Sequence, residues 1–279
     1  MRALSVSRLV LMGLLAAEGL LAILAGPDAL THMTHAAAQA DAARRPVLVE
    51  LFTSEGCSSC PPADALLARL DQTQFVPGAQ AIVLSEHVTY WNQDGWHDPF
   101  SMDAMTDRQT DYKFRLGTGE IYTPQAGVDG ATQRVGRDER KLAAAVQQAA
   151  VAAKAPLTIQ DAQWAGNAVR FSVKGAGDTK TVLMAALAED SAETSVKAGE
   201  NKGRSLHHVA VVRAMQEMGK GADDGRALTL KAPADKADKA SQEKTGQASP
   251  DSGAMRLVVF VADKHNGHVL AVAEKTISR

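Results

Sequence analysis

The chain has 279 residues, of which 45% are apolar and 4% aromatic, and its formal net charge is −2 at pH 7. The apolar share excludes a disordered chain, and the near-neutral charge argues against a nucleic-acid partner, which needs a basic face on the protein. After the first 26 residues, no apolar run approaches the ~20 residues that span a bilayer. The two cysteines, Cys57 and Cys60, are too few for a disulfide scaffold.

The N-terminal segment has the pattern of a secretory signal. Two arginines precede an apolar stretch over residues 9–24, and Ala38-Gln39-Ala40 fits the small-x-small pattern of a signal peptidase site. We therefore expect a signal peptide over 1–40, a periplasmic or secreted mature protein, and no membrane association after cleavage. An uncleaved anchor is the alternative, although Glu18 would be costly in a permanent span.

Strand and helix patterns alternate over residues 41–155, which predicts an α/β sheet. Pro61 and Pro62 suit the first turn of a helix, where their missing N–H groups do no harm. The other predicted elements are strands over 47–52 and 81–84, a helix over 101–116, an Asp129-Gly130 hairpin turn and a helix over 140–153.

The pattern changes over residues 156–279, where short alternating segments separated by turns predict a β-sandwich domain. Residues 231–254 are polar and charged, which predicts a disordered loop. The predicted strands are 157–160, 168–173, 181–187, 208–212, 227–230, 257–261 and 270–273.

The cysteines form a Cys-x-x-Cys motif between a predicted strand and a predicted helix start. A thiolate at a helix N-terminus is stabilised by free N–H groups and by the helix dipole, which lower its pKa. We interpret Cys57 as a nucleophile and Cys60 as the thiol that resolves a mixed disulfide. Glu55 would raise the thiol pKa if its charge lies nearby.

The chain resembles two families of different breadth. A β-rich run leading into Cys57-Ser58-Ser59-Cys60, with Thr123-Pro124 later, resembles the thioredoxin superfamily. More narrowly, the segments VELFTSEGCSSCPPAD, LSEHVTYWNQDGWHDPF and YTPQ are similar to a secreted bacterial family catalogued as domain of unknown function 1223. The thioredoxin resemblance covers about residues 46–153 and implies an α/β thioredoxin-like domain with a long aromatic insertion. The strand pattern described above predicts that an all-β sandwich-like domain follows it.

The thioredoxin resemblance also implies roles for individual residues. Pro124 would have a cis peptide bond, lie against the cysteines and contact the substrate backbone, with Thr123 beside it. Glu50 is the nearest counterpart of the buried acid on the first strand. If Glu50 points inward it could accept the proton of Cys60; the alternative is a surface or ion-paired glutamate. Gly56 stands where ordinary thioredoxins have an aromatic residue.

Seven of the twelve aromatic residues lie in segment 85–122. Ligand sites in open parallel sheets form beyond the carboxyl ends of strands, so Glu86 and His87 are expected beside Cys57 as substrate-binding residues. Tyr90, Trp91 and Trp96 are then candidates for an aromatic substrate-binding wall, and the alternative is a satellite core.

The leading hypothesis is a thiol–disulfide oxidoreductase that acts on protein or small thiol or disulfide substrates, with a redox partner and without a cofactor. One alternative is a Cu(I)-binding protein that uses Cys57, Cys60 and His87, because thiolates and imidazole suit that soft ion. The other is a non-enzymatic ligand-binding protein with a structural disulfide, although so short a loop gains little entropically.

Overall fold

The computed structural model describes residues 44–175, 177–221, 225–232 and 254–278. The predicted signal peptide, 1–40, and most of the predicted loop at 231–254 lie outside the described residues. In the described part of the chain, no helix is long and apolar enough to cross a membrane.

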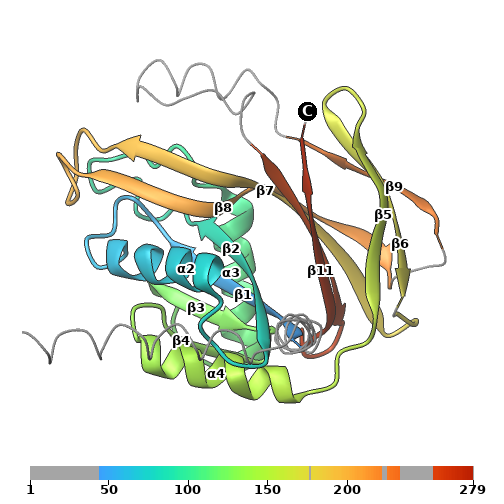
Figure 1. Ribbon diagram of the computed structural model, residues 1–279. Coiled ribbons are helices and arrows are strands. Elements are labelled where there is room, and N and C mark those ends of the chain that lie inside the picture. Colours follow the sequence, from blue (N-terminus) through green and yellow to red (C-terminus); the bar gives the residue numbers. More distant parts are fainter. Residues whose placement is uncertain (1–43, 176, 222–224, 233–253, 279) are drawn as a thin grey trace, which may run out of the picture. The chain divides into compact units, whose positions relative to one another are not determined.

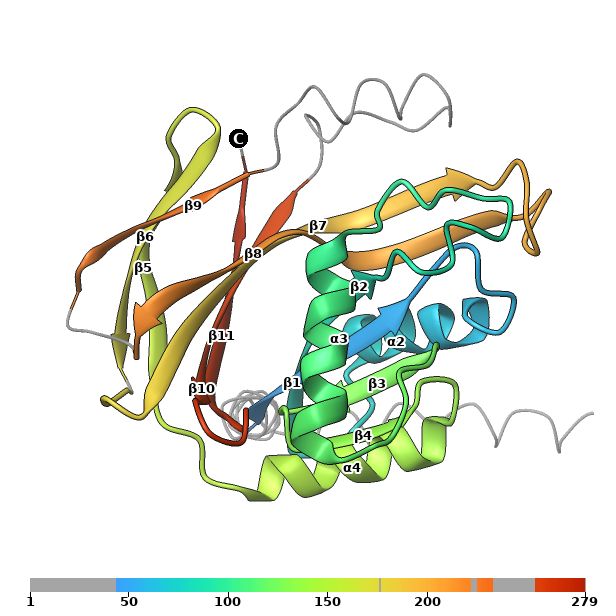
Figure 2. The same cartoon turned by 180° about the vertical axis from the view of Figure 1, so that it is seen from behind.

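The described residues form eleven strands and three helices, and the strands make up two sheets (Figure 1; Figure 2). The helices are α2 (Pro61–Thr73), α3 (Asp103–Leu116) and α4 (Glu139–Val151). The first strands are β1 (Arg45–Thr53), β2 (Ala79–His87), β3 (Gln125–Val128), β4 (Thr132–Val135), β5 (Leu157–Trp164) and β6 (Ala168–Gly175). They are followed by β7 (Thr181–Ser195), β8 (Ser205–Lys220), β9 (Ala227–Lys231), β10 (Met255–Asp263) and β11 (Val269–Ile277).

The larger sheet has eight strands in the order β11-β10-β7-β8-β2-β1-β3-β4. It is mixed: β1 and β2 are parallel, β2 meets β8 in parallel where Ser85 faces Val211, and the other neighbours are antiparallel. Strands β5, β6 and β9 form a separate antiparallel sheet. The contact between β2 and β8 joins the first four strands to the later ones.

The expected fold class, an α/β thioredoxin-like domain followed by an all-β sandwich-like domain, is wrong. Strands predominate, and strands from both expected halves share the eight-stranded sheet. The physical reason lies in β7 and β8, which extend well beyond the predicted strands 181–187 and 208–212. Their pairing register shifts at Leu183/Met184 and Leu187/Ala188, and such bulges interrupt the period-two pattern from which a strand is recognised.

The expected long aromatic insertion is also wrong. Segment 85–122 contains the end of β2, a run of turns and helix α3, which lies along the large sheet (Figure 2). Its buried aromatic residues divide among three apolar clusters, so they serve as core residues of the extended sheet. The clusters pair Tyr112 with Phe52 and Val88, Trp96 with Val196 and Leu206, and Phe100 with Ala192 and Val211.

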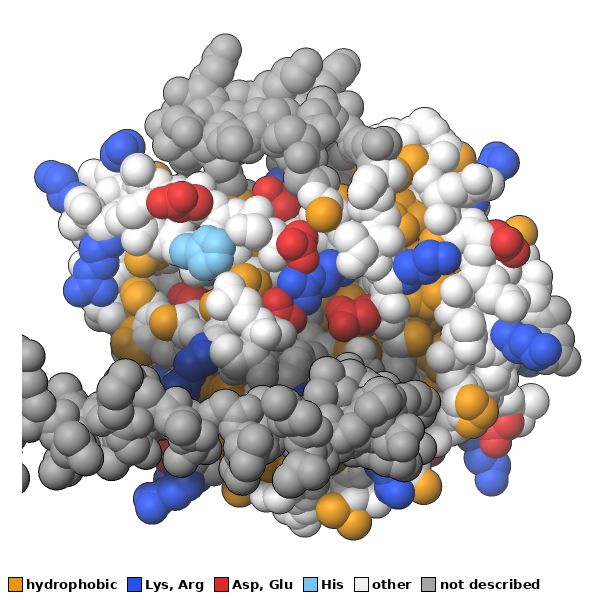
Figure 3. Space-filling view, in the orientation of Figure 1, with side chains coloured by type: hydrophobic (Ala, Val, Ile, Leu, Met, Phe, Trp, Pro, Cys, Tyr) orange, Lys and Arg blue, Asp and Glu red, His pale blue; other side chains and the backbone are white. Residues whose placement is uncertain are grey.

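Strand β10 shows how one sheet serves two cores. Leu257, Val259 and Val261 pack toward the three-stranded sheet, whereas Val258 and Phe260 pack in the core that contains the helices. Successive side chains of a strand point to opposite faces, and a strand covered on both faces is apolar throughout. The outer surface is different: on the face seen in Figure 3, acidic and basic side chains are interspersed.

Candidate functional site

Cys57 and Cys60 are joined by a disulfide bond, with their Cα atoms 5.4 Å apart. Both cysteines are 0% exposed, whereas Ser58 between them is exposed and Ser59 is partly exposed. The two sulfur atoms are therefore shielded from solvent although the intervening backbone lies at the surface.

The start of α2 has few free backbone donors. Cys60 is the N-cap residue of the helix, and Pro61 and Pro62 occupy its first two positions. Proline has no backbone N–H group, so two donors of the first turn are missing. The N–H group of Ser58, between the cysteines, donates to Glu200.

The connection between β7 and β8, residues 196–204, closes over the disulfide. The Asn201 side-chain nitrogen donates to the carbonyl oxygens of Glu55 and Cys57, at 2.8 and 3.0 Å. Glu200 accepts the N–H of Ser58 at 3.0 Å, and these contacts with Ser58 lower the pKa of Glu200. We call residues 196–204 the hairpin end.

The Asn201→Ala protein tests whether the hairpin end restricts access. It loses two hydrogen bonds to the loop that carries Cys57, so we expect reduction of the disulfide by dithiothreitol to accelerate about tenfold. The rate is measured by alkylating the released thiols and separating the products by mass. Asn167→Ala, at an exposed asparagine in the turn between β5 and β6, is the control. Equal rates in the two variants would contradict a covering role.

A buried charge cluster lies between the cysteine loop, α2 and β8. His208 Nε2 is 3.3 Å from Glu55 Oε1, and His208 Nδ1 is 3.8 Å from Asp64 Oδ1. Burial by itself lowers the pKa of His208, but Asp64 and Glu55 raise it to about 10. His208 therefore carries a positive charge at neutral pH, between two carboxylates that flank the cysteines in the sequence.

Neutral donors hold the same carboxylates in place. Trp96 Nε1 donates to Glu55 at 2.8 Å, and the Thr53 hydroxyl donates to Asp64 at 2.8 Å. Trp96, expected as a substrate-binding residue, is thus buried and bound to Glu55. Glu55 and Asp64 thus bring two carboxylates, and His208 one imidazolium, to this cluster.

His87 lies next to this cluster rather than on the disulfide. Its Nδ1 is 2.7 Å from Asp98 Oδ2, and its ring meets the His208 ring edge-on, with centroids 4.7 Å apart. Burial alone would raise the pKa of Asp98, but His87 and two backbone N–H groups hold it below the ordinary value.

The proposed copper ligands are not brought together by any described interaction. Within the described ranges, no hydrogen bond or ion pair joins His87 to Cys57 or Cys60, and no group of three or more His, Cys, Asp or Glu residues is arranged to hold a metal ion. The Cu(I) alternative stays a prediction without structural support.

Three of the expected substrate-binding residues meet beside the cysteine loop. Trp91 Nε1 donates to the Thr123 hydroxyl at 2.7 Å. A Cβ atom on Gly56 would lie 3.0 Å from the Cβ atom of Trp91, which explains why glycine stands before Cys57. The Thr123–Pro124 peptide bond is cis, as the resemblance implied. Tyr90 lies alongside Trp91, with ring centroids 6.3 Å apart.

Glu50 and Glu86 belong to a second buried network. Arg108 Nε donates to Glu50 at 2.6 Å and lies 3.6 Å from Glu86, and the Tyr112 hydroxyl also donates to Glu50. Burial raises the pKa of Glu86 well above its ordinary value, and the charge of Glu50 adds to this. Glu50 therefore points inward and is ion-paired. None of its hydrogen bonds or ion pairs in the described part reaches Cys60, so its role as proton acceptor stays a prediction.

Sequence reasoning missed the residues contributed from far along the chain. On β8, His207 is exposed and its neighbour His208 is buried. The signal that could have pointed to His208 is strand alternation, which places neighbouring side chains on opposite faces of the sheet. Asp64, Asp98 and Asn201 had no recognisable local pattern.

Residues 48–248 match the model of the family described as Protein of unknown function (DUF1223). The chain belongs to the DUF1223 family. This DUF1223 chain is also similar to the crystal structure of protein AGR_C_4864 from Agrobacterium tumefaciens. The two share 26% sequence identity, the match covers 83% of this chain and 93% of that one, and the TM-score is 0.57.

A second solved structure matches the DUF1223 chain over less than half of its length. A β-glucuronidase from Ruminococcus gnavus matches 44% of this chain and 15% of its own length, at 12% identity and a TM-score of 0.21. A comparison with curated proteins gave no match. None of these matches shows membership of the thioredoxin superfamily.

Proposed function

We propose that this DUF1223 protein is an exported thiol–disulfide oxidoreductase whose redox centre is the Cys57–Cys60 disulfide. The proposal rests on the location of that disulfide in the fold. It closes a Cys-x-x-Cys motif at the start of a helix, next to the buried charges of Glu55, Asp64 and His208. A purely structural purpose is less attractive, because a loop this short gives little entropic stabilisation.

The chemistry requires only the two sulfur atoms and a substrate. In oxidation of a dithiol, a substrate thiolate attacks Cys57 Sγ, the bond to Cys60 breaks, and Cys60 leaves as a thiolate that takes up a proton. The second substrate thiolate then attacks the substrate sulfur atom that is bonded to Cys57 in the mixed disulfide. This forms the substrate disulfide and releases Cys57 as a thiolate. Two electrons pass from the substrate to the cysteine pair. The same steps in reverse reduce a substrate disulfide.

The surroundings favour the reducing direction. A pair whose thiolates are poorly stabilised prefers the oxidised form and gives its electrons away readily. Here Glu55 and Asp64 outnumber His208, and Pro61 and Pro62 remove helix donors. We therefore propose that the pair reduces substrate disulfides and is itself re-reduced by a dithiol partner.

Access to the sulfur atoms needs a movement of the hairpin end, because both cysteines are buried. We expect a substrate that has entered to contact Trp91, Thr123 and Pro124. Trp91 lies against Gly56, the residue before Cys57, and donates to Thr123, which precedes Pro124. Their role in binding is part of this proposal.

Turnover of a disulfide-bonded peptide, with dithiothreitol as the reductant, tests the function. We expect Cys57→Ser to reduce the rate to that of reductant alone, and Cys60→Ser to accumulate a mixed disulfide with the peptide, because the resolving thiol is missing. Ser58→Ala keeps both cysteines and is the matched control. Equal turnover by the wild type and Cys57→Ser would rule out a redox role.

A further inference from the structure

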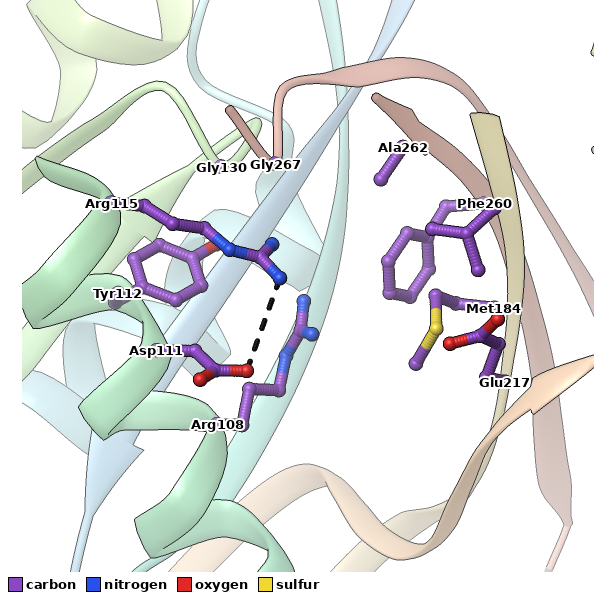
Figure 4. Close-up of a pocket in the computed structure, with 11 residues that line it drawn as sticks. Arg108, Asp111, Tyr112, Arg115, Gly130, Met184, Glu217, Phe260, Ala262 and Gly267 are labelled. Carbon is purple, nitrogen blue, oxygen red and sulfur yellow. Dashed lines mark ion pairs between the residues drawn. The ribbon is translucent and has the colours of Figure 1, made fainter. Parts of the chain in front are cut away.

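A cavity of about 140 Å³ lies between helix α3 and the large sheet (Figure 4), and neither cysteine lines it. Arg108 and Arg115 form one wall, and Met184 and Phe260 form the other, with Glu217 beside them. Both guanidinium groups point into the space between these walls (Figure 4). No step of the proposed redox chemistry uses these residues.

Arg108 is held firmly and still has donors to spare. Its guanidinium carbon lies 5.3 Å from the Phe260 ring centroid and 5.7 Å from that of Tyr112. Glu50 binds its Nε and Nη2 atoms, and Glu86 lies near Nε. Among the described residues no partner binds Arg108 Nη1. A fixed guanidinium edge with two N–H groups therefore faces the cavity.

Glu50 neutralises the charge of Arg108, so the positive charge available to a ligand comes from Arg115. Its one ion pair within the described chain is with Asp111, at 3.9 Å, and both side chains are substantially exposed, 39% and 66%. Such a pair is weak, so Arg115 can exchange it for a ligand. A guanidinium donates two parallel hydrogen bonds to a carboxylate.

The apolar wall and the size of the cavity determine which chemical group can follow the carboxylate of the ligand. Met184, Phe260 and Ala262 present apolar surface to the cavity. A dry cavity of about 150 Å³ holds a benzene molecule, so this one suits a compact group of similar size. Glu217 on the far side opposes a second negative charge.

We propose that this cavity binds a small monocarboxylate with a short apolar chain or ring. The carboxylate lies against Arg115 and Arg108, and the apolar part lies against Phe260 and Met184. Dicarboxylates and phosphates bind less well, because Glu217 repels the second charge. This inference does not depend on the redox function.

Calorimetric titration of the purified protein with butanoate tests the site, and butanamide serves as a neutral probe of the same shape. We expect saturable one-to-one binding of butanoate in the millimolar range or tighter, and binding of butanamide about tenfold weaker or more. Arg115→Gln should weaken butanoate binding about tenfold. Lys113→Gln, on the same helix but outside the cavity, should leave binding unchanged.

A second variant tests the location of the site without changing a charge. Ala262→Leu fills the cavity and should abolish binding of butanoate while thermal unfolding shows that the protein remains folded. The proposal is overturned if butanoate gives no saturable binding, if butanamide binds equally well, or if Arg115→Gln binds like the wild type. Undiminished binding by a folded Ala262→Leu protein would also overturn it.

Discussion

The Arg108→Met protein is expected to have a free energy of unfolding about 3–5 kcal/mol lower than that of the wild type, because removing one partner of a buried ion pair leaves the other uncompensated. Glu50 is 0% exposed and, among the described residues, would keep only the Tyr112 hydroxyl as a donor. Glu86, also fully buried, loses its nearest cation. Urea unfolding at neutral pH measures the difference.

Arg69→Met is the matched control, since it makes the same substitution at a surface pair. Arg69 lies 2.5 Å from Glu139, but both side chains are half exposed, 50% and 51%, so the expected cost is below about 1 kcal/mol. The double variant Arg108→Met/Glu50→Gln should recover part of the lost stability, because Glu50 then carries no buried charge without a partner, whereas Glu86 still lacks its cation. If Arg108→Met costs no more than Arg69→Met, the network is not the buried ionic core described here.

The wild-type protein is expected to lose stability as the pH rises from about 6.5 towards 10, and His208→Gln is expected to lack most of that decline. The pKa of His208 is about 10 in the folded protein, against 6.5 for an unperturbed imidazole. Its stabilising effect is therefore complete below pH 6.5 and disappears as the pH rises through about 10. The difference reaches roughly 2–4 kcal/mol in the free energy of unfolding by about pH 9.

The neighbouring residue provides the control for this pH effect. His207 is exposed and adjacent in the sequence, so His207→Gln should keep the wild-type profile. Glu86 acts in the same direction as His208, since its pKa is raised and its contribution is also lost as the pH rises. The comparison of His208→Gln with His207→Gln removes that shared contribution. Parallel profiles for the two variants would contradict a charged His208 between Glu55 and Asp64.

Local structure could be predicted from the sequence because its causes are local. Asp138 accepts the N–H of Lys141 and caps α4, and the Asp129-Gly130 turn joins β3 and β4. The pairing of β2 with β8 depends on residues more than a hundred positions apart and has no local signature. The fold class was therefore wrong although most predicted strands and helices exist.

The residues of the candidate site likewise divide into those that the sequence could identify and those that only the fold brings together. The Cys57–Cys60 disulfide and the helix that follows come from one contiguous motif, so the sequence was sufficient to find them. Asn201 and His208 reach that motif only because β7 and β8 fold back over it. For Glu50 the sequence left two alternatives open, and the choice required its partner on α3, Arg108.

The reduction potential of the Cys57–Cys60 pair tests the central claim most directly. Purified protein is equilibrated in redox buffers of defined thiol–disulfide ratio, and free thiols are trapped by alkylation at each ratio. A redox centre that reduces substrate disulfides should give a potential between about −200 and −300 mV. A potential below about −300 mV is typical of structural disulfides that resist reduction, and it would contradict the proposed function.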